Sequence, residues 1–220
     1  LTKGKMPEIL TKKADDWHAD LKNFLDKGEK PTQAVKARYR HEEIKLALIN
    51  ETHGKCIYCE SKLRHIVHGD IEHIVPKSKQ PMKTFEWENL GLACDVCNGN
   101  KGDFFPDADE NFHDQLIDPY VDNPDDHFLF ARELLVPLPG DMRAMQTEKI
   151  IQLGRSELVE RRRERMAFID GLVRAYVLAG NQYKQMLLDD IYENHLDESD
   201  EFFAFCNAYM LLIKQKGIIP

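Results

Sequence analysis

The sequence predicts an α+β fold in which a small core lies between two helical regions. Apolar residues recur at helical spacing near both ends of the 220-residue chain. The middle, residues 55–103, is instead dense in Cys, His and Gly and has few long periodic runs. We therefore expect an N-terminal helical region (1–54), a core (55–104), and a loop segment followed by a C-terminal helical region (105–220).

The composition is that of an ordinary globular protein, with 42% hydrophobic and 31% charged residues. No apolar run approaches the roughly 18 residues that a membrane span needs. The N-terminal stretch LTKGKMPEIL has no apolar signal-peptide segment. We expect a cytoplasmic protein without membrane contact, and in that compartment paired cysteines bind metal more often than they form disulfides.

The charge is acidic overall and unevenly distributed. The formal net charge is −8, which argues against tight phosphate binding by the whole surface. Residues 102–131 hold nine acidic residues and no Lys or Arg, and residues 189–201 hold seven more. Residues 143–165, in contrast, are rich in arginine. Each run alone is typical of a solvated surface, but together they leave room for a basic substrate path.

Two helices are expected in the N-terminal region. Pro7 suits a first helical turn, and apolar residues follow it at helical spacing until Gly28. The pattern predicts one helix over 7–27 and a second from Pro31 to about Gly54.

The cysteines of the core form two C-x-x-C pairs that are separated by 34 residues. Four thiolates suit a tetrahedral structural zinc ion, and the gap can hold a strand, a loop and a second strand. A redox pair needs only one C-x-x-C, in a βαβ context that this sequence lacks. A zinc ion would therefore close a large loop through Cys56, Cys59, Cys94 and Cys97. The fifth cysteine, Cys206, lies in an apolar helical stretch and is interpreted as a core residue.

The segment DIEHIVPKSK (70–79) separates the two pairs. Its β-branched residues favour a strand that Pro76 ends. Strict alternation would send Glu72 and His73 to opposite faces, although a bend at the strand end could turn both toward one site. The C-terminal half of the gap holds Asn89 and then a short apolar strand (90–93).

A helix is expected directly after the second strand. Asn98 follows the last cysteine of the second pair and stands near the start of this helix. A helix N-terminus presents free N–H groups and favours a nearby phosphate, and Lys101 extends that bias.

The remaining chain is expected to begin as a loop and to end in helices. Residues 104–146 are rich in proline and aspartate, which is typical of a structured loop region with small elements. Ser156 could cap a helix that runs to about Gly180. Two more helices are expected over about 181–194 and 200–216.

The core resembles the HNH endonucleases of the ββα-metal type, through IEHIVPKS, ENL, and CDVCNGNKGD with the upstream CIYC. The resemblance implies one active site with a single divalent ion, magnesium or manganese. It implies that His73 is the general base and that Glu72 and Asn98 are ligands of this ion. Asn89 would fix the loop and orient His73. The chain departs from the common pattern with Glu before the histidine and Asn at the third position, but both residues offer oxygen atoms that suit a hard cation.

Several basic residues near these motifs are candidate substrate contacts. Lys77, Lys101 and Arg64 are individually typical of surface charges. Collectively they are plausible contacts to phosphate.

Segments outside the core resemble a narrower group within this family. TFEWENL, NKGD, LIDPYVDNPDDHF and LGRSELVERRRERM are similar to the PtuB-type HNH nucleases of bacterial Septu and retron-linked anti-phage systems. The resemblance implies nucleic acid as the target, DNA rather than RNA. It implies an ABC-type ATPase, PtuA, as the partner, and in some versions a retron reverse transcriptase. We hypothesise that the acidic segments 103–126 and 189–201 serve to dock the partner.

Two other functions compete with a nuclease. A catalytically silent zinc module that binds nucleic acid or protein would need the four cysteines but no particular residue at positions 72, 73, 89 or 98. A DNA-binding regulator is less favoured, because the charge is acidic and no recognition helix is evident. The full set of motif residues favours the enzyme.

Overall fold

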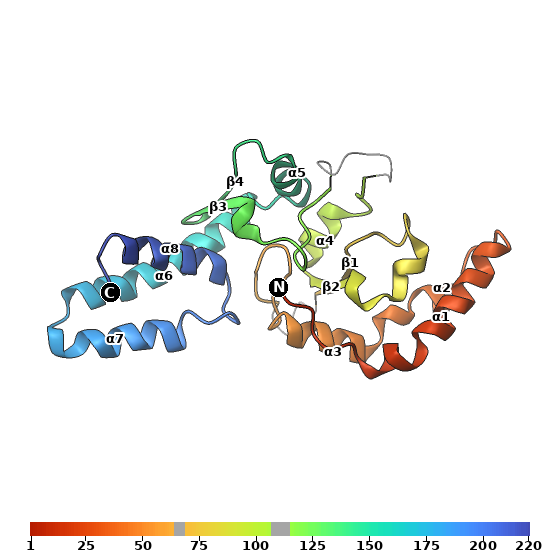
Figure 1. The fold of residues 1–220 in the computed structure, drawn as a ribbon, viewed down its shortest axis with the longest axis horizontal. Helices are drawn as coiled ribbons and strands as arrows, with labels where there is room; N and C mark the ends of the chain where they lie inside the picture. The colour runs from red at the N-terminus through yellow and green to blue at the C-terminus, as the bar shows by residue number, and fades with distance from the viewer. Residues whose placement is uncertain (64–68, 107–114) are drawn as a thin grey trace.

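The chain is elongated, with the first helices and the last helices of the sequence on opposite sides of a small central unit (Figure 1). The computed structural model describes residues 1–63, 69–106 and 115–220. Arg64 therefore lies outside the described residues. Helices α6, α7 and α8 form one end of the molecule, α1 and α2 form the other, and β1, β2 and α4 lie between them (Figure 1).

The N-terminal region confirms the first predicted helix and corrects the second. The single helix expected from Pro31 is in fact broken into short pieces, because Thr32 caps a first turn and His41 is extended and caps the next helix through its ring. The break leaves Tyr39 buried at a bend of the chain. The elements are α1 (Glu8–Asp26), α2 (Gln33–Lys36), the 3₁₀ turn η1 (Arg38–Arg40) and α3 (Glu42–Glu51).

The central unit has the predicted strand, loop, strand and helix. The two strands pair antiparallel, with Glu72 opposite Gly91 and His73 opposite Leu90. The first strand ends at His73, because the chain bends at the next two residues. The elements are β1 (Asp70–His73), η2 (Pro81–Phe85), η3 (Trp87–Asn89), β2 (Leu90–Ala93) and α4 (Asp95–Lys101).

The C-terminal region has the three predicted long helices and elements that the sequence did not predict. The expected loop region holds a hairpin and a further helix, which Asp141 caps by accepting from the backbone N–H of Ala144 at 2.8 Å. The expected cap by Ser156 is wrong, because Ser156 is the first helical residue and makes no cap hydrogen bond. The elements are η5 (Pro124–Asp126), β3 (Phe128–Ala131), β4 (Leu134–Pro137), α5 (Met142–Ile151), α6 (Ser156–Leu178), α7 (Asn181–Asn194) and α8 (Phe203–Gln215).

Two hydrophobic clusters meet at β2 and α4. Leu90 and Leu92 of β2 pack into the N-terminal cluster with residues of α1 and α3. Ala93 and the four paired cysteines pack into the C-terminal cluster with residues of α6, α7 and α8. The central unit is too small to bury a large core of its own, so apolar burial against both helical regions contributes to its stability. Within the described residues, no helix is long and apolar enough to cross a membrane.

Candidate functional site

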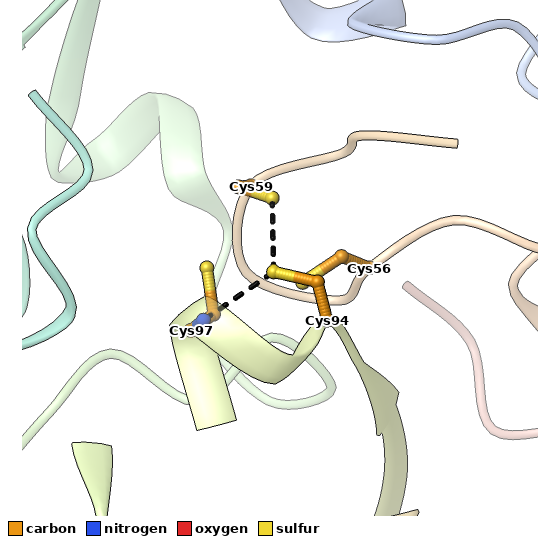
Figure 2. A group of neighbouring side chains, drawn as sticks. All are labelled: Cys56, Cys59, Cys94 and Cys97. Atoms are coloured by element: carbon orange, nitrogen blue, oxygen red, sulfur yellow. Dashed lines mark hydrogen bonds between the residues drawn. The ribbon is translucent and has the colours of Figure 1, made fainter. Parts of the chain in front are cut away.

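The four paired cysteines converge in one buried cluster (Figure 2). Their Sγ atoms all lie within 4.8 Å of one another, and Cys59 and Cys94 are 4.0 Å apart. Cys56 and Cys59 come from a turn before β1, whereas Cys94 and Cys97 come from the first turn of α4. The Cys94 sulfur also accepts the backbone N–H of Cys97 at 3.3 Å, so the second pair is part of the helix cap.

The geometry and chemistry of this cluster fit a zinc ion. Sulfur ligands about 2.3 Å from a tetrahedral zinc ion are about 3.8 Å from one another. Burial raises the pKa of the Cys56 thiol well above its ordinary value, and a bound cation would oppose that rise. Arg155 Nη1 donates to the Cys97 sulfur at 3.6 Å and adds positive charge beside the cluster. The predicted structural zinc site therefore has the donor set that it needs, and its metal stays a proposal.

The acidic segment before α8 is bonded to the turn that carries the first cysteine pair. Lys55 Nζ donates to the carbonyl oxygens of Glu198 and Asp200, and the Lys62 backbone N–H donates to Glu201 Oε1 at 3.1 Å. Part of the segment 189–201, which we hypothesised to dock a partner, is thus used inside the chain.

A second site is an open cavity of about 390 Å³ beside β1 and α4. It brings together four of the predicted site residues, namely Glu72, His73, Asn98 and Lys77. All four residues of β1, from Asp70 to His73, line it, so residues from both faces of the strand reach the cavity. Its other lining residues are Tyr39, Arg40, Asp70, Ile71, Pro76, Ser78, Gly102 and Asp103.

His73 is held in a defined orientation and is only 5% exposed. Its Nε2 lies 3.1 Å from the Thr84 carbonyl oxygen. Because a carbonyl oxygen only accepts, Nε2 carries the hydrogen and Nδ1 keeps the lone pair. Burial, together with the nearby Lys77 ammonium, lowers the pKa of His73 to about 4. The imidazole is therefore neutral and able to accept a proton at physiological pH.

Glu72 and Lys101 form a buried ion pair. Lys101 Nζ lies 2.6 Å from Glu72 Oε1 and also donates to the backbone carbonyl of His73 at 3.0 Å. Burial raises the pKa of the Glu72 carboxyl, while the Lys101 charge opposes the rise. Lys101 does not line the cavity, and its side chain is 2% exposed, so its ammonium serves Glu72 and not the cavity.

Asn98 and Asp70 meet at the cavity wall. Asn98 Nδ2 donates to Asp70 Oδ2 at 3.1 Å. Because a carboxylate only accepts, the amide nitrogen faces Asp70 and the amide oxygen Oδ1 remains for another partner. Carboxylate and amide oxygens around one cavity are the donors that magnesium or manganese prefers. The residues therefore fit a hard divalent cation.

Asn89 does not line the cavity, but its side chain holds the loop that follows His73. Its Oδ1 accepts the backbone N–H of Val75 at 2.7 Å, and its Nδ2 donates to the carbonyls of Val75 and Lys83 at 3.1 and 3.0 Å. Lys83 precedes Thr84, the partner of His73. These contacts are those that the predicted loop-fixing role requires.

The N-terminal region contributes to this cavity, which the sequence did not predict. Tyr39 and Arg40 lie in η1, where a continuous helix was expected. Neither belongs to a recognisable motif. The one available signal was Thr32, because threonine favours the N-cap position of a helix, and Thr32 caps the short helix α2.

The strand, loop, strand and helix around this cavity are the arrangement that the resemblance to HNH endonucleases predicts. Residues 56–104 match the profile of the family described as HNH endonuclease. The chain therefore contains an HNH endonuclease domain, and the predicted resemblance is confirmed. The profile covers β1, β2, α4 and the four paired cysteines, but neither helical region.

Two relatives extend the similarity beyond the domain. The chain is 36% identical over 85 residues to the Septu protein PtuB of Bacillus thuringiensis, which is 38% of this chain and 31% of that relative. It is 26% identical over 187 residues to the Septu protein PtuB of Bacillus mycoides (strain KBAB4), which is 70% of this chain and 63% of that relative. The matched stretches thus span less than two thirds of either relative, and the predicted likeness to PtuB-type proteins is confirmed.

Proposed function

We propose that this chain is a metal-dependent endonuclease that hydrolyses phosphodiester bonds of nucleic acid. The observation that carries the proposal is a single open cavity shared by His73, Glu72 and Asn98. A base and two oxygen donors around one cavity are what metal-assisted hydrolysis needs.

His73 is the general base in this proposal. Its neutral Nδ1 takes a proton from the attacking water, and its Nε2–H stays bonded to Thr84, which keeps the ring in one orientation. Asn89 supports this arrangement by holding the loop that carries Thr84.

Glu72 and Asn98 would hold one magnesium or manganese ion through oxygen atoms. Such an ion offsets charge on the phosphate and on the leaving oxygen. Lys101 occupies Glu72 Oε1, which leaves Oε2 as the oxygen for the ion. Cys56, Cys59, Cys94 and Cys97 would hold a structural zinc ion, and so fix the helix that carries Asn98.

The target and the partners are inferred from the relatives. Because both are named Septu protein PtuB, we infer a role in a bacterial anti-phage complex, with DNA as the target and a PtuA-type ABC ATPase as the partner. Lys77 and Arg64 are the proposed phosphate contacts. A retron reverse transcriptase and a cytoplasmic location are implied by the sequence resemblance and composition alone.

The test is cleavage of supercoiled plasmid in magnesium or manganese, by the wild type and by His73→Ala, each with and without a co-expressed ATPase of this type. We expect cleavage by the wild type and none by a folded, zinc-loaded His73→Ala protein. Cleavage only in the presence of the ATPase would support the complex. The same assay on RNA decides the target.

The competing function is a silent zinc module that binds nucleic acid or a protein. It predicts metal-loaded, folded protein and no His73-dependent cleavage of either nucleic acid. The neutral, oriented His73 beside two oxygen donors favours the enzyme, because a binding module does not need a free ring nitrogen at a cavity.

A further inference from the structure

The cavity wall has a part that lies outside the endonuclease domain. Tyr39 and Arg40 line the cavity, although the family profile begins at residue 56. Both come from η1 in the N-terminal helical region. The domain alone therefore does not complete the cavity.

Tyr39 connects His73 to two cationic side chains. The Tyr39 ring stands edge-on to the His73 ring, with centroids 4.6 Å apart and an interplanar angle of 81°. Its hydroxyl oxygen accepts from Lys77 Nζ at 3.4 Å and from Arg40 Nε at 3.3 Å. Tyr39 is only 5% exposed, so it is a fixed support for both cations.

Arg40 and Lys77 have no carboxylate partner within ion-pair distance in the part of the chain that the structure describes. Arg38, two residues away in the same turn, is paired with Asp20 at 2.8 Å. Two cations without a direct ion pair beside one cavity are suited to an external anion, although Asp70, Glu72 and Asp103 line the same cavity. Arginine binds phosphate through a planar fork of donors, of which the Tyr39 contact uses only Nε–H.

The cavity thus joins two sets of contacts around His73. One set is cationic and comprises Arg40 and Lys77 on Tyr39. The other set offers oxygen atoms and comprises Glu72, Asp70 and Asn98. A phosphodiester is the ligand class that needs both, because it carries negative charge and, in hydrolysis, also contacts a divalent ion.

We propose that Arg40 and Lys77, held by Tyr39, bind a backbone phosphate of the nucleic-acid substrate beside the phosphate that is cleaved. The proposal rests on the proposed nuclease function and extends its active site into the N-terminal region. Arg40 and Lys77 are substrate-binding residues, and Tyr39 is a positioning residue. Because phosphate contacts carry no base information, this contact serves DNA of any sequence.

The first experiment measures binding of a short fluorescent DNA duplex in a His73→Ala background, over a range of salt concentrations. We expect Arg40→Ala to raise Kd about tenfold and to reduce the salt slope by about one phosphate contact, or about 0.9. Arg40→Lys should recover most of the slope, because it restores the charge. Arg38→Ala is the matched control and should change Kd less than about twofold, since its partner is Asp20.

The second experiment separates positioning by Tyr39 from a merely structural role. Tyr39→Phe removes the hydroxyl and keeps the ring beside His73, so it should weaken binding about threefold in the His73→Ala background. The same change should have no further effect when Arg40 and Lys77 are already alanine. An equal loss in both backgrounds would overturn the positioning role.

The result that overturns the phosphate contact is an Arg40→Ala protein with the same Kd and salt slope as Arg38→Ala, or a parent protein that does not bind DNA. Failure of the nuclease proposal is a different result, in which the wild type binds DNA but cleaves neither DNA nor RNA, with or without the ATPase. If the wild type cleaves, Arg40→Ala should raise KM about tenfold and change kcat less than about threefold.

Discussion

The cysteine cluster and the His73 cavity share helix α4 but are built on different principles. The cluster has four identical donors, all buried, and they come from two tight turns. The cavity is open and takes unlike side chains from η1, β1, the following loop and α4. The first arrangement is suited to holding a structural metal ion, and the second to admitting a substrate.

The two sites also depend on opposite sides of the molecule. The cysteines pack into the C-terminal cluster, with α6, α7 and α8 (Figure 1). Tyr39, beside His73, packs into the N-terminal cluster with Leu90 and Leu92 of β2. Changes at the cysteine cluster should therefore act on folding, and changes at the His73 cavity should act on chemistry or binding.

The largest expected effect is the loss of a cysteine ligand. Cys97→Ala should abolish zinc binding and remove on the order of 10 kcal/mol of folding free energy, because metal binding and folding of such a core are coupled. Zinc per chain by native mass spectrometry and thermal unfolding measure the effect. Cys206→Ala is the matched control: this cysteine is buried outside the cluster and should cost about 1 kcal/mol and no zinc. A Cys97→Ala protein that still binds a full complement of zinc would show that Cys97 is no more a zinc ligand than Cys206 is.

A change at His73 should separate chemistry from folding. His73→Ala should slow cleavage about 10²- to 10⁴-fold, which is the usual contribution of a general base, and leave zinc content unchanged. His53→Asn is the control, because His53 is exposed and lies outside the cavity. Initial cleavage rates and zinc content are measured on the same preparations. Equal rates for the two variants would mean that the base is another residue.

Loss of the Glu72–Lys101 ion pair should act on folding, although Glu72 lines the cavity. Lys101→Met leaves the Glu72 carboxylate buried without its cation and should destabilise the protein by about 3 kcal/mol at neutral pH. Lys77→Met, at an exposed position of the cavity, should cost less than about 0.5 kcal/mol. Urea unfolding of both variants gives the comparison. Similar losses for the two lysines would show that the buried pair contributes little.

The same contrast explains what the sequence could and could not predict. The zinc ligands were predictable because a C-x-x-C turn is a local structure and two copies mark one site. Glu72, His73 and Asn98 were predictable as a pattern, and the structure brings them to one cavity. Lys101 was predicted to contact phosphate. It is instead buried against Glu72, because α4 packs on β1, and the spacing of residues in the sequence does not reveal that packing.

Tyr39 and Arg40 were beyond prediction for a related reason. The contacts of Tyr39 with Lys77 and His73 join residues more than thirty positions apart in the chain. They also require the helix expected from Pro31 to break before His41. Local propensity is a weak guide to such a break, because tertiary packing of Tyr39 in the N-terminal cluster overrides it.

A smaller effect is expected where the C-terminal region touches the cysteine cluster. Arg155 donates to the Cys97 sulfur, so its charge should stabilise the thiolates. Arg155→Ala should accelerate zinc release to a chelator several-fold, which corresponds to about 1 kcal/mol, with little change in cleavage rate. Arg163→Ala is the control, because Arg163 is exposed and pairs with Glu133. Release at the same rate from both variants would argue against a contribution of Arg155 to the cluster.

The smallest expected change concerns the titration of His73. Its pKa is lowered to about 4 by burial and by Lys77, so the unfolded chain binds this proton first and the residue lowers stability as pH falls from 6.5 toward 4. An NMR titration should give a His73 midpoint near 4, and Lys77→Ala should move it upward. Lys184→Ala should leave it in place, because Lys184 lies in α7 of the C-terminal helical region. A wild-type midpoint near 6.5 would mean that the cavity is wetter than its side-chain packing indicates, and would make the base partly protonated, and so less effective, at physiological pH.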